Sequence, residues 1–487
     1  MKRFWLLLIP IICWATTTPV TIDQLIGMAR SASGEFAAEA LIRIAGIDKV
    51  ETPRKLALLE EAFDRAGEAQ LAFRRQASIT KISGPAGVFN RIYAQGLDAM
   101  SLRLKAVDAM IPLDSRKARE MFRRIPPIKL PPLTCDEYMA YDVDGFYDVL
   151  ERLAHSLTPA EIEDGECFRL IQPYVAAVAA PVQLPGAAHL IAVGKVSDKD
   201  FQTLMSEFGK AMEKISGDDR SFTHVAAGPQ IRSLVQAAQQ RKISPIGLLE
   251  AYRTYIVNNM SAARCADDDL MINVAQSFAF VDPRLAEEQG VDPAVYFNGR
   301  LRIPPIEDIQ EQEITPSKLE GTASGLRGCE DDSCKAIIRK YLDLIYDSQR
   351  NPYPPARKET PEWQKQFREF LDSMAAWQPQ EAAVAAQHFR EKSFLYSELA
   401  SLAPNTANRI AVLRAELGYL RKAKATAENS VQWFLAVNTL IGRITLDPLG
   451  LGPLADDLRA AGDPIIALFV ELDAVAPRTP PQILPMM

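Results

Sequence analysis

The stretch Cys329-Glu-Asp-Asp-Ser-Cys334 leads directly into Lys335-Ala-Ile-Ile-Arg-Lys-Tyr-Leu-Asp-Leu-Ile345. It gives one of the strongest local signals of secondary structure in the sequence. Its second half has the apolar spacing of an amphipathic α-helix. Acids before such a helix favour its start, because they meet unpaired N–H groups and the positive end of the helix dipole. Cys265-Ala-Asp-Asp-Asp269 opens a second helical pattern in the same way. The alternative interpretation is that the two acidic triplets together bind Ca²⁺, but capping is favoured.

The same period recurs along nearly the entire chain. Near the N-terminus Ile22, Leu25, Ile26 and Ala29 fall on one helical face. Further starts are predicted where a capping residue precedes the pattern. These capping residues are Thr52 before Pro53, Asp114, Thr158 with Glu161, and Thr360 before Pro361. The sequence therefore predicts an all-α, solenoid-like fold of stacked helical hairpins in two or three lobes.

Proline-rich strings divide the chain, because proline lacks the N–H that a helix interior requires. Arg-Ile-Pro-Pro-Ile occurs at 124–128 and again at 302–306. The predicted regions are a signal peptide (1–15), a helical-hairpin region (16–127), a central helical domain (134–302), a linker with a Cys329–Cys334 loop and one helix (303–358), a C-terminal helical domain (359–476) and a loose tail (477–487).

Part of residues 50–127 resembles tetratricopeptide-type repeats. Ala118 and Phe122 followed by Pro126, and Leu59, Phe63 and Ala66, match the second helix of that motif, while Leu102 and Ala106 match packing positions of the first. The glycine and tyrosine positions of the motif are not matched. The resemblance implies stacked helical hairpins that serve as a binding scaffold.

The N-terminus has the pattern of a secretory signal. Met1-Lys2-Arg3 is basic, the segment from Phe4 to Trp14 is apolar, and small residues suit a cut after Ala15. No later segment reaches ~18 consecutive apolar residues, so no transmembrane segment is expected after signal removal. We therefore expect an exported protein, periplasmic or extracellular.

An exported protein can form disulfides, so its cysteines are candidates for disulfide pairing. Cys135, Cys167, Cys265, Cys329 and Cys334 remain after the signal is removed, an odd number. Cys329 with Cys334 and Cys135 with Cys167 are the candidate pairs. A zinc site is disfavoured because no histidine lies near them.

One segment resembles a calcium-binding EF-hand loop. With Gly145 at its sixth position, the loop places Asp142, Asp144, Asp148 and Glu151 at ligand positions. Ala140 occupies the first position, where the family has Asp. The competing and favoured interpretation is that Asp144 caps a helix beginning at Gly145.

The amino-acid composition argues against two classes of function. A net charge of −7 and only four histidines argue against a nucleic-acid partner and against histidine-based catalysis. Phosphate-binding and metalloprotease motifs are absent. The sequence favours an exported scaffold or binding protein of the cell envelope, with a protein or envelope component as partner. The alternatives are a metal-binding enzyme or hydrolase whose carboxylates converge, such as Asp142, Asp144, Asp268 and Asp331, and an envelope structural protein without a ligand.

Overall fold

The computed structural model describes residues 20–77, 91–134, 139–216, 219, 221–224, 227–260, 332–346, 357–358, 360–379, 385–424 and 430–476. These residues form an all-α structure, as predicted. The strands among them are β1 (Arg75–Ala77) and β2 (Met139–Tyr141), which pair antiparallel. Within these ranges no helix has the length and apolar character needed to cross a membrane.

The helices divide into two arms. The first, called the N-terminal arm, covers residues 20–260. Besides the two strands, it contains α1 (Ile22–Ser31), α2 (Gly34–Ala45), α3 (Thr52–Arg65), η1 (Ala66–Glu68), α5 (Ala99–Met110), α6 (Ser115–Arg123), α7 (Asp144–His155), α8 (Pro159–Glu163), α9 (Glu166–Ala176), η3 (Pro181–Gln183), α10 (Leu184–Val193), α11 (Asp198–Glu213), α12 (Ser221–His224), α13 (Gly228–Gln240) and α14 (Ile246–Met260).

The second, called the C-terminal arm, covers residues 332–476. It contains α19 (Asp332–Ile345), α20 (Pro361–Ala376), α21 (Ala385–Leu402), α22 (Thr406–Ala423), α23 (Ser430–Leu446), α24 (Pro448–Arg459) and α25 (Pro464–Val475).

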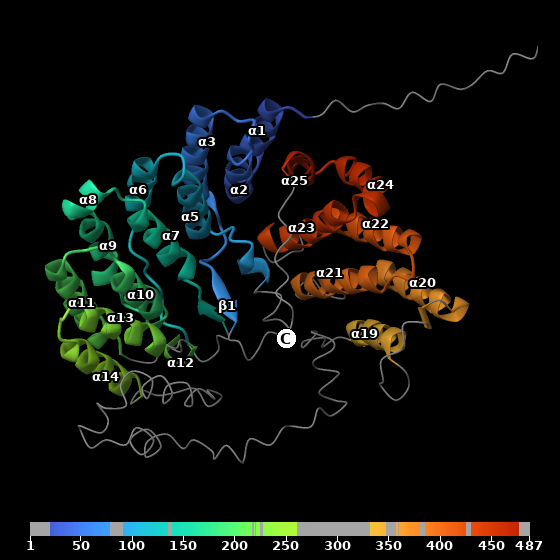
Figure 1. The fold of residues 1–487 in the computed structure, drawn as a ribbon. Coiled ribbons are helices and arrows are strands. Elements are labelled where there is room, and N and C mark those ends of the chain that lie inside the picture. Colours follow the sequence, from blue (N-terminus) through green and yellow to red (C-terminus); the bar gives the residue numbers. More distant parts are fainter. Residues whose placement is uncertain are drawn as a thin grey trace, which may run out of the picture.

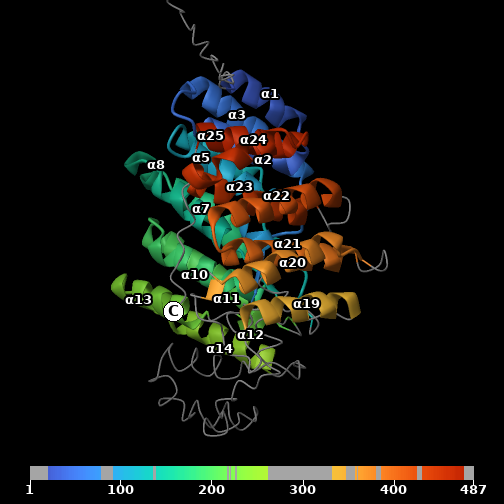
Figure 2. The same ribbon diagram turned by 90° about the vertical axis from the view of Figure 1, so that its right-hand side faces the viewer.

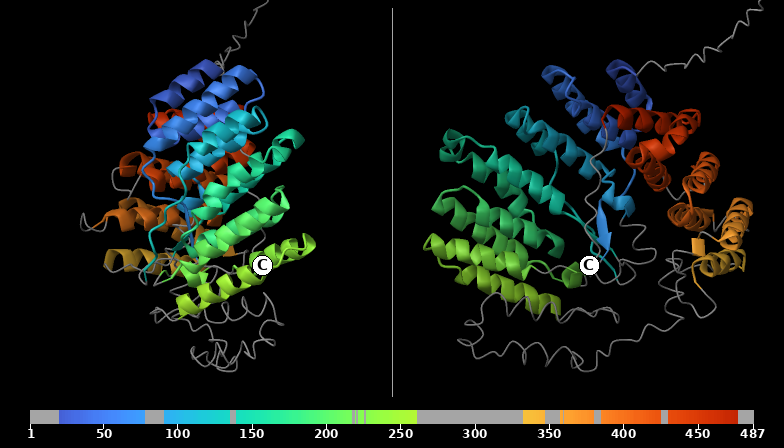
Figure 3. Two further views of the ribbon diagram at one scale, coloured as in Figure 1. Left: turned by 90° about the vertical axis from the view of Figure 1, so that its left-hand side faces the viewer. Right: turned by 45° about the vertical axis from the view of Figure 1, so that its right-hand side comes forward.

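The two arms form an arch that closes at its top (Figure 1). The N-terminal arm descends from α1 to α14, and the C-terminal arm rises from α19 to α25. There α25 contacts both α1 and α2, so the two ends of the described chain are neighbours in space. The turned views show the same two stacks meeting at this place (Figure 2 and Figure 3).

The junction of the arms is both apolar and polar. The Phe36 ring lies 4.7 Å from that of Phe434, which in turn lies 4.6 Å from Phe469. Arg43 pairs with Asp473 across the junction. Because ring pairs at this distance add to the free energy of burial, the arms are expected to unfold together.

Most predicted helix starts are confirmed. Asp114 accepts a hydrogen bond from Lys117 N, and Thr158 forms the reciprocal capping box with Glu161. The prediction for α3 is wrong by one residue, because Thr52 is already helical and Glu51 is the N-cap.

The packing of the N-terminal arm depends on close helix contacts. Phe36, Ala37, Ala38 and Leu41 of α2 are fully buried, since α1, α3, α5 and α25 surround this helix. At Gly186 a Cβ atom would lie 2.5 Å from the Tyr147 ring, so α7 and α10 approach closely only because this residue is glycine.

Candidate functional site

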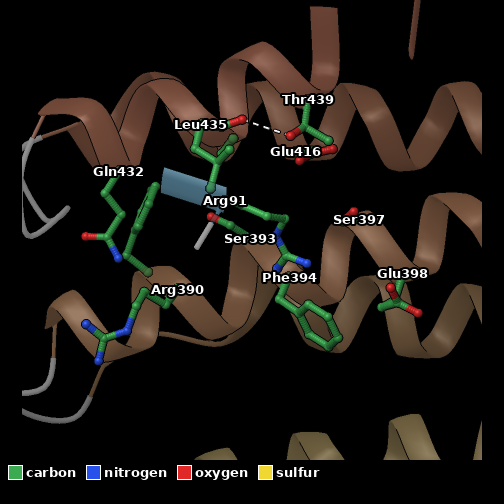
Figure 4. A pocket seen from close by; sticks show the side chains of 12 residues that line it. Arg91, Arg390, Ser393, Phe394, Ser397, Glu398, Glu416, Gln432, Leu435 and Thr439 are labelled. Carbon is green, nitrogen blue, oxygen red and sulfur yellow. Dashed lines mark hydrogen bonds between the residues drawn. The ribbon is translucent and has the colours of Figure 1, made fainter. Parts of the chain in front are cut away.

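A pocket of about 160 Å³ lies between α21, α22 and α23 and receives one residue, Arg91, from the N-terminal arm. In Figure 4 the short ribbon that carries Arg91 enters between α21 and α23. Cavities of ~150 Å³ admit molecules of the size of benzene. The pocket therefore has room for a small organic ligand.

Helix α21 supplies one wall through two adjacent rows of residues spaced by four, which lie on one side of a helix. The row formed by Arg390, Phe394 and Glu398 places two opposite charges on either side of a ring. The rows are Phe389, Ser393 and Ser397, and Arg390, Phe394 and Glu398. One helical face thus offers charged, hydroxyl and aromatic groups to the same space.

Helix α23 supplies the facing wall and holds the N-terminal arm in place. Its Gln432, Leu435 and Thr439 line the pocket. Asn438 Nδ2 donates to Gln95 Oε1 at 3.1 Å, and Gln95 Nε2 donates to the Val431 carbonyl at 3.4 Å. These bonds fix the segment that carries Arg91.

The Arg91 guanidinium stands in a charged environment. Loss of water lowers its pKa, and the nearby Glu398 carboxylate opposes that shift. Glu398 itself accepts a hydrogen bond from Tyr341 Oη at 3.3 Å. Arg91 and Glu398 therefore present opposite charges from the two arms.

Glu416 is a buried acid of the site with a strongly shifted pKa. It is 1% exposed, and burial raises its pKa to about 7, although the neighbouring Arg443 opposes the shift. A buried acid that titrates near neutrality is typical of functional sites. Glu416 can therefore exist in this pocket as an acid or as a carboxylate at ordinary pH.

Arg443 lies behind the pocket wall. Its Nη2 donates to Ser397 Oγ at 2.7 Å and to the Ser397 carbonyl at 2.9 Å. Burial lowers its pKa, while Glu416 opposes this shift. Arg443 thus orients a hydroxyl of α21 and keeps positive charge beside the buried acid.

Several buried polar atoms of this region lack a hydrogen-bond partner among the described residues. These atoms are Ser393 Oγ, Glu416 Oε2, Tyr419 Oη and Arg443 Nη1. An unsatisfied buried polar group typically costs about 1–3 kcal/mol. Of these residues Ser393 and Glu416 line the pocket, so a polar ligand could satisfy their hydroxyl and carboxylate oxygens.

Lys392 is a buried charge of α21 with a different role. Its Nζ donates to the Trp377 carbonyl at 2.5 Å and lies 4.8 Å from the centre of the Tyr419 ring. Burial lowers its pKa to about 8. Since Trp377 is the C-cap of α20, Lys392 satisfies the end of that helix.

The four residues of the EF-hand-like segment are not assembled into a metal site. Asp142 pairs with Arg74 at 2.7 Å, and Glu151 Oε2 lies 3.2 Å from His189 Nε2. Asp144 and Asp148 are near enough for repulsion to add to the effect of burial, which raises both pKa values. In the described ranges no three His, Cys, Asp or Glu side chains are placed to hold a metal ion.

The segment instead starts a helix. Asp142 Oδ1 accepts a hydrogen bond from Asp144 N at 3.2 Å, and α7 begins at Asp144. The favoured interpretation, that Asp144 caps a helix beginning at Gly145, is wrong in its residues: Asp144 is already helical, the N-cap is Val143, and the side chain that bonds the first helical N–H is that of Asp142. Of the acids in the alternative enzyme hypothesis, Asp268 and Asp331 lie outside the described residues.

The cysteine predictions have different outcomes. Cys167 is a free, buried thiol of α9, so its predicted bridge to Cys135 is not formed in this structure. Burial raises the pKa of this thiol. Cys334 is buried with its Sγ 2.8 Å from Glu391 Oε2. Cys135, Cys265 and Cys329 lie outside the described ranges, so the Cys329–Cys334 bridge stays a prediction.

The pocket residues were not predicted from the sequence, although one signal was present. Leu413, Leu417 and Leu420 form the apolar stripe of α22, and Glu416 lies within it, three residues after Leu413. An acid on the buried face of a helix is unusual and marks a candidate site. Arg91, in contrast, is separated from α21 by about 300 residues of chain, so only the fold brings it to the pocket.

Searches against protein-family models, curated proteins and solved structures found no match for this chain. The resemblance to tetratricopeptide-type repeats therefore stays a prediction.

Proposed function

We propose that this chain is a binding protein that holds a small polar ligand where its two arms meet. The observation that carries the proposal is the composition of the pocket wall, in which Arg91 of the N-terminal arm faces α21 and α23 of the C-terminal arm. A ligand that contacts both walls would stabilise the closed arch, because binding to the folded state shifts the folding equilibrium.

The chemistry of the wall supports binding more than catalysis. Charges of opposite sign lie near one another, Arg91 near Glu398 in the wall and Arg443 behind it near Glu416. Such pairs orient a ligand and give specificity. A concave, partly apolar pocket with a few convergent polar groups is the usual form of a small-molecule site.

We further propose that the protein acts outside the cytoplasm as a component of the cell envelope. The N-terminal pattern of basic, apolar and small residues in 1–15 supports this. N-terminal sequencing of the protein from its own cells should find Thr16 as the first residue. An intact Met1 in the fractionated protein would contradict export.

Native mass spectrometry of the protein purified from its own envelope fraction tests the binding function. The expected spectrum contains a small-molecule adduct that is lost in Arg91→Ala. Arg152→Ala is the matched control, because this arginine pairs with Asp108 in the N-terminal arm, away from the C-terminal helices. A spectrum without an adduct, or an adduct that Arg91→Ala retains in full, would contradict the proposal.

A further inference from the structure

The polar groups of the pocket define which ligand fits it. Positive charge comes from Arg91 and Arg390, which line the pocket, and from Arg443 behind it. Negative charge comes from Glu398 and from the fully buried Glu416. Both signs are therefore present within one small volume.

Glu416 restricts the ligand most, because its Oε2 has no hydrogen-bond partner among the described residues. A buried carboxylate left without donors is unfavourable for folding. A ligand ammonium group would supply those donors together with the opposite charge. The hydroxyl of Ser393, which also lacks a partner there, lies on the facing helix.

We propose that the pocket binds a free α-amino acid with an apolar side chain, whose ammonium group meets Glu416 and whose carboxylate meets Arg91. This inference rests on the proposed binding function and names its ligand class. Phe389, Phe394 and Leu435 line the same space and would contact the apolar side chain.

Ligands with one charge fit less well. A simple carboxylate would meet Arg91 but would leave Glu416 unpaired and would add a like charge beside it. A simple amine would pair with Glu416 but would face the guanidinium group of Arg91. Like charges placed together across an interface are unfavourable, so each single-charge ligand is disfavoured.

Proton release is a second consequence. Glu416 interacts electrostatically with Arg443 of α23 and with Tyr396 of α21. Arg409 lies near Arg443, Tyr419 lies near Tyr396, and Arg91, Arg390 and Glu398 line the same pocket. Near pH 7 a substantial fraction of Glu416 is protonated. An ammonium group favours the carboxylate form, so amino-acid binding should release protons and weaken at lower pH. A simple anion would instead promote proton uptake.

Isothermal titration calorimetry of the full protein tests the ligand class. The probes are L-alanine, L-valine, L-leucine and L-phenylalanine, each compared with its amine lacking the carboxylate and its acid lacking the amino group. At least one amino acid should bind ten times more tightly than both of its analogues. If no amino acid does so, or if an acid or amine binds equally well, the inference is wrong.

Two further measurements distinguish failure of the amino-acid proposal from failure of the proposed binding function. Titrations at pH 7 in buffers of different ionisation enthalpy should show proton release, and Glu416→Gln should abolish it and weaken binding at least tenfold. Glu369→Gln on the exposed face of α20 is the control and should change neither. Proton uptake would overturn the inference. An Arg91-dependent adduct of another chemical class would preserve the proposed function and reject the amino acid.

Discussion

The buried charged groups of the two arms differ in what they contact. In the N-terminal arm Arg119 pairs with Glu161, and Asp142 pairs with Arg74. In the C-terminal arm Glu416 has a carboxylate oxygen without a hydrogen-bond partner in the described ranges, and burial raises its pKa. The N-terminal arm also has a buried acid with such an oxygen, Asp98, but its other oxygen accepts a hydrogen bond from Ser101 N and caps α5. Glu416 lines the pocket instead. The comparison teaches that a buried acid with an unpartnered oxygen can serve as a helix cap in one arm and line a pocket in the other.

The largest expected effect tests whether the arms form one cooperative unit. Phe36→Ala should lower the free energy of unfolding by about 3–5 kcal/mol, because a fully buried ring is lost at the junction. Trp363, Trp377 and Trp433 all lie in the C-terminal arm, while Trp5 and Trp14 lie in the predicted signal peptide. Tryptophan fluorescence of protein lacking residues 1–15 during urea unfolding therefore reports the C-terminal arm.

If the two arms unfold together, Phe36→Ala should shift the unfolding midpoint measured by fluorescence as much as the midpoint measured by circular dichroism. Phe201→Ala, an equally buried truncation in α11, is the comparison within the N-terminal arm. An unchanged fluorescence midpoint in Phe36→Ala would show that the arms unfold independently.

The next prediction concerns the effect of Glu416 ionisation on stability. The pKa of Glu416 is raised from 4.5 to about 7 in the folded protein, so the folded state binds more protons than the unfolded state between these values. Stability therefore falls as pH rises through this range. Glu416→Gln should be more stable than the wild type by up to about 3 kcal/mol at pH 8, and the gain should shrink toward pH 4.5.

Chemical denaturation at several pH values measures this difference. Glu369→Gln, which changes an exposed carboxylate of α20, should show no comparable pH-dependent gain. A gain for Glu416→Gln that is equal at pH 5 and pH 8 would mean that ionisation of this acid does not limit stability.

A smaller effect tests the packing of the N-terminal arm. Gly186→Ala should lower the free energy of unfolding by about 1–3 kcal/mol, because the added methyl group would overlap the Tyr147 ring. Gly418→Ala in α22 is the matched substitution, since the added Cβ would meet no atom within 4 Å beyond its chain neighbours and its own helix backbone. It should raise stability by up to about 1 kcal/mol through helix propensity. Thermal unfolding of both variants gives the comparison, and a stable Gly186→Ala would contradict the close contact.

The final prediction has the smallest effect on the fold and concerns the joint at the start of the C-terminal arm. Trypsin should release the peptide from Gly328 to Lys335, which holds Cys329 and Cys334. If the bridge forms, the non-reduced peptide should weigh two hydrogens less and resist alkylation. Alkylation at both cysteines without prior reduction would exclude the bridge.

Local features of the fold were predictable because they depend on neighbouring residues. The capping box of Thr158 and Glu161 and the cap at Asp114 follow from spacing alone. The burial of Trp363 and Trp433 also follows from their apolar helical context. Errors arose where two local solutions compete, since either Asp142 or Asp144 could cap α7.

The pocket was less predictable, because its residues come from separate helices and both arms. The apolar stripe of α22 was visible in the sequence, but the burial of Glu416 depends on how α21 and α23 cover that helix. Likewise the free thiol of Cys167 depends on where α9 packs, and not on the spacing of the cysteines.

By itself the sequence determined that the chain is helical and where most helices begin, since a 3.6-residue period and side-chain caps act over a few residues. Only the tertiary structure decided that α25 lies beside α1 and α2, and that Arg91 reaches the pocket beside Glu416. Helical periodicity states which face is buried but not against which partner, because apolar surface is non-directional in what it contacts.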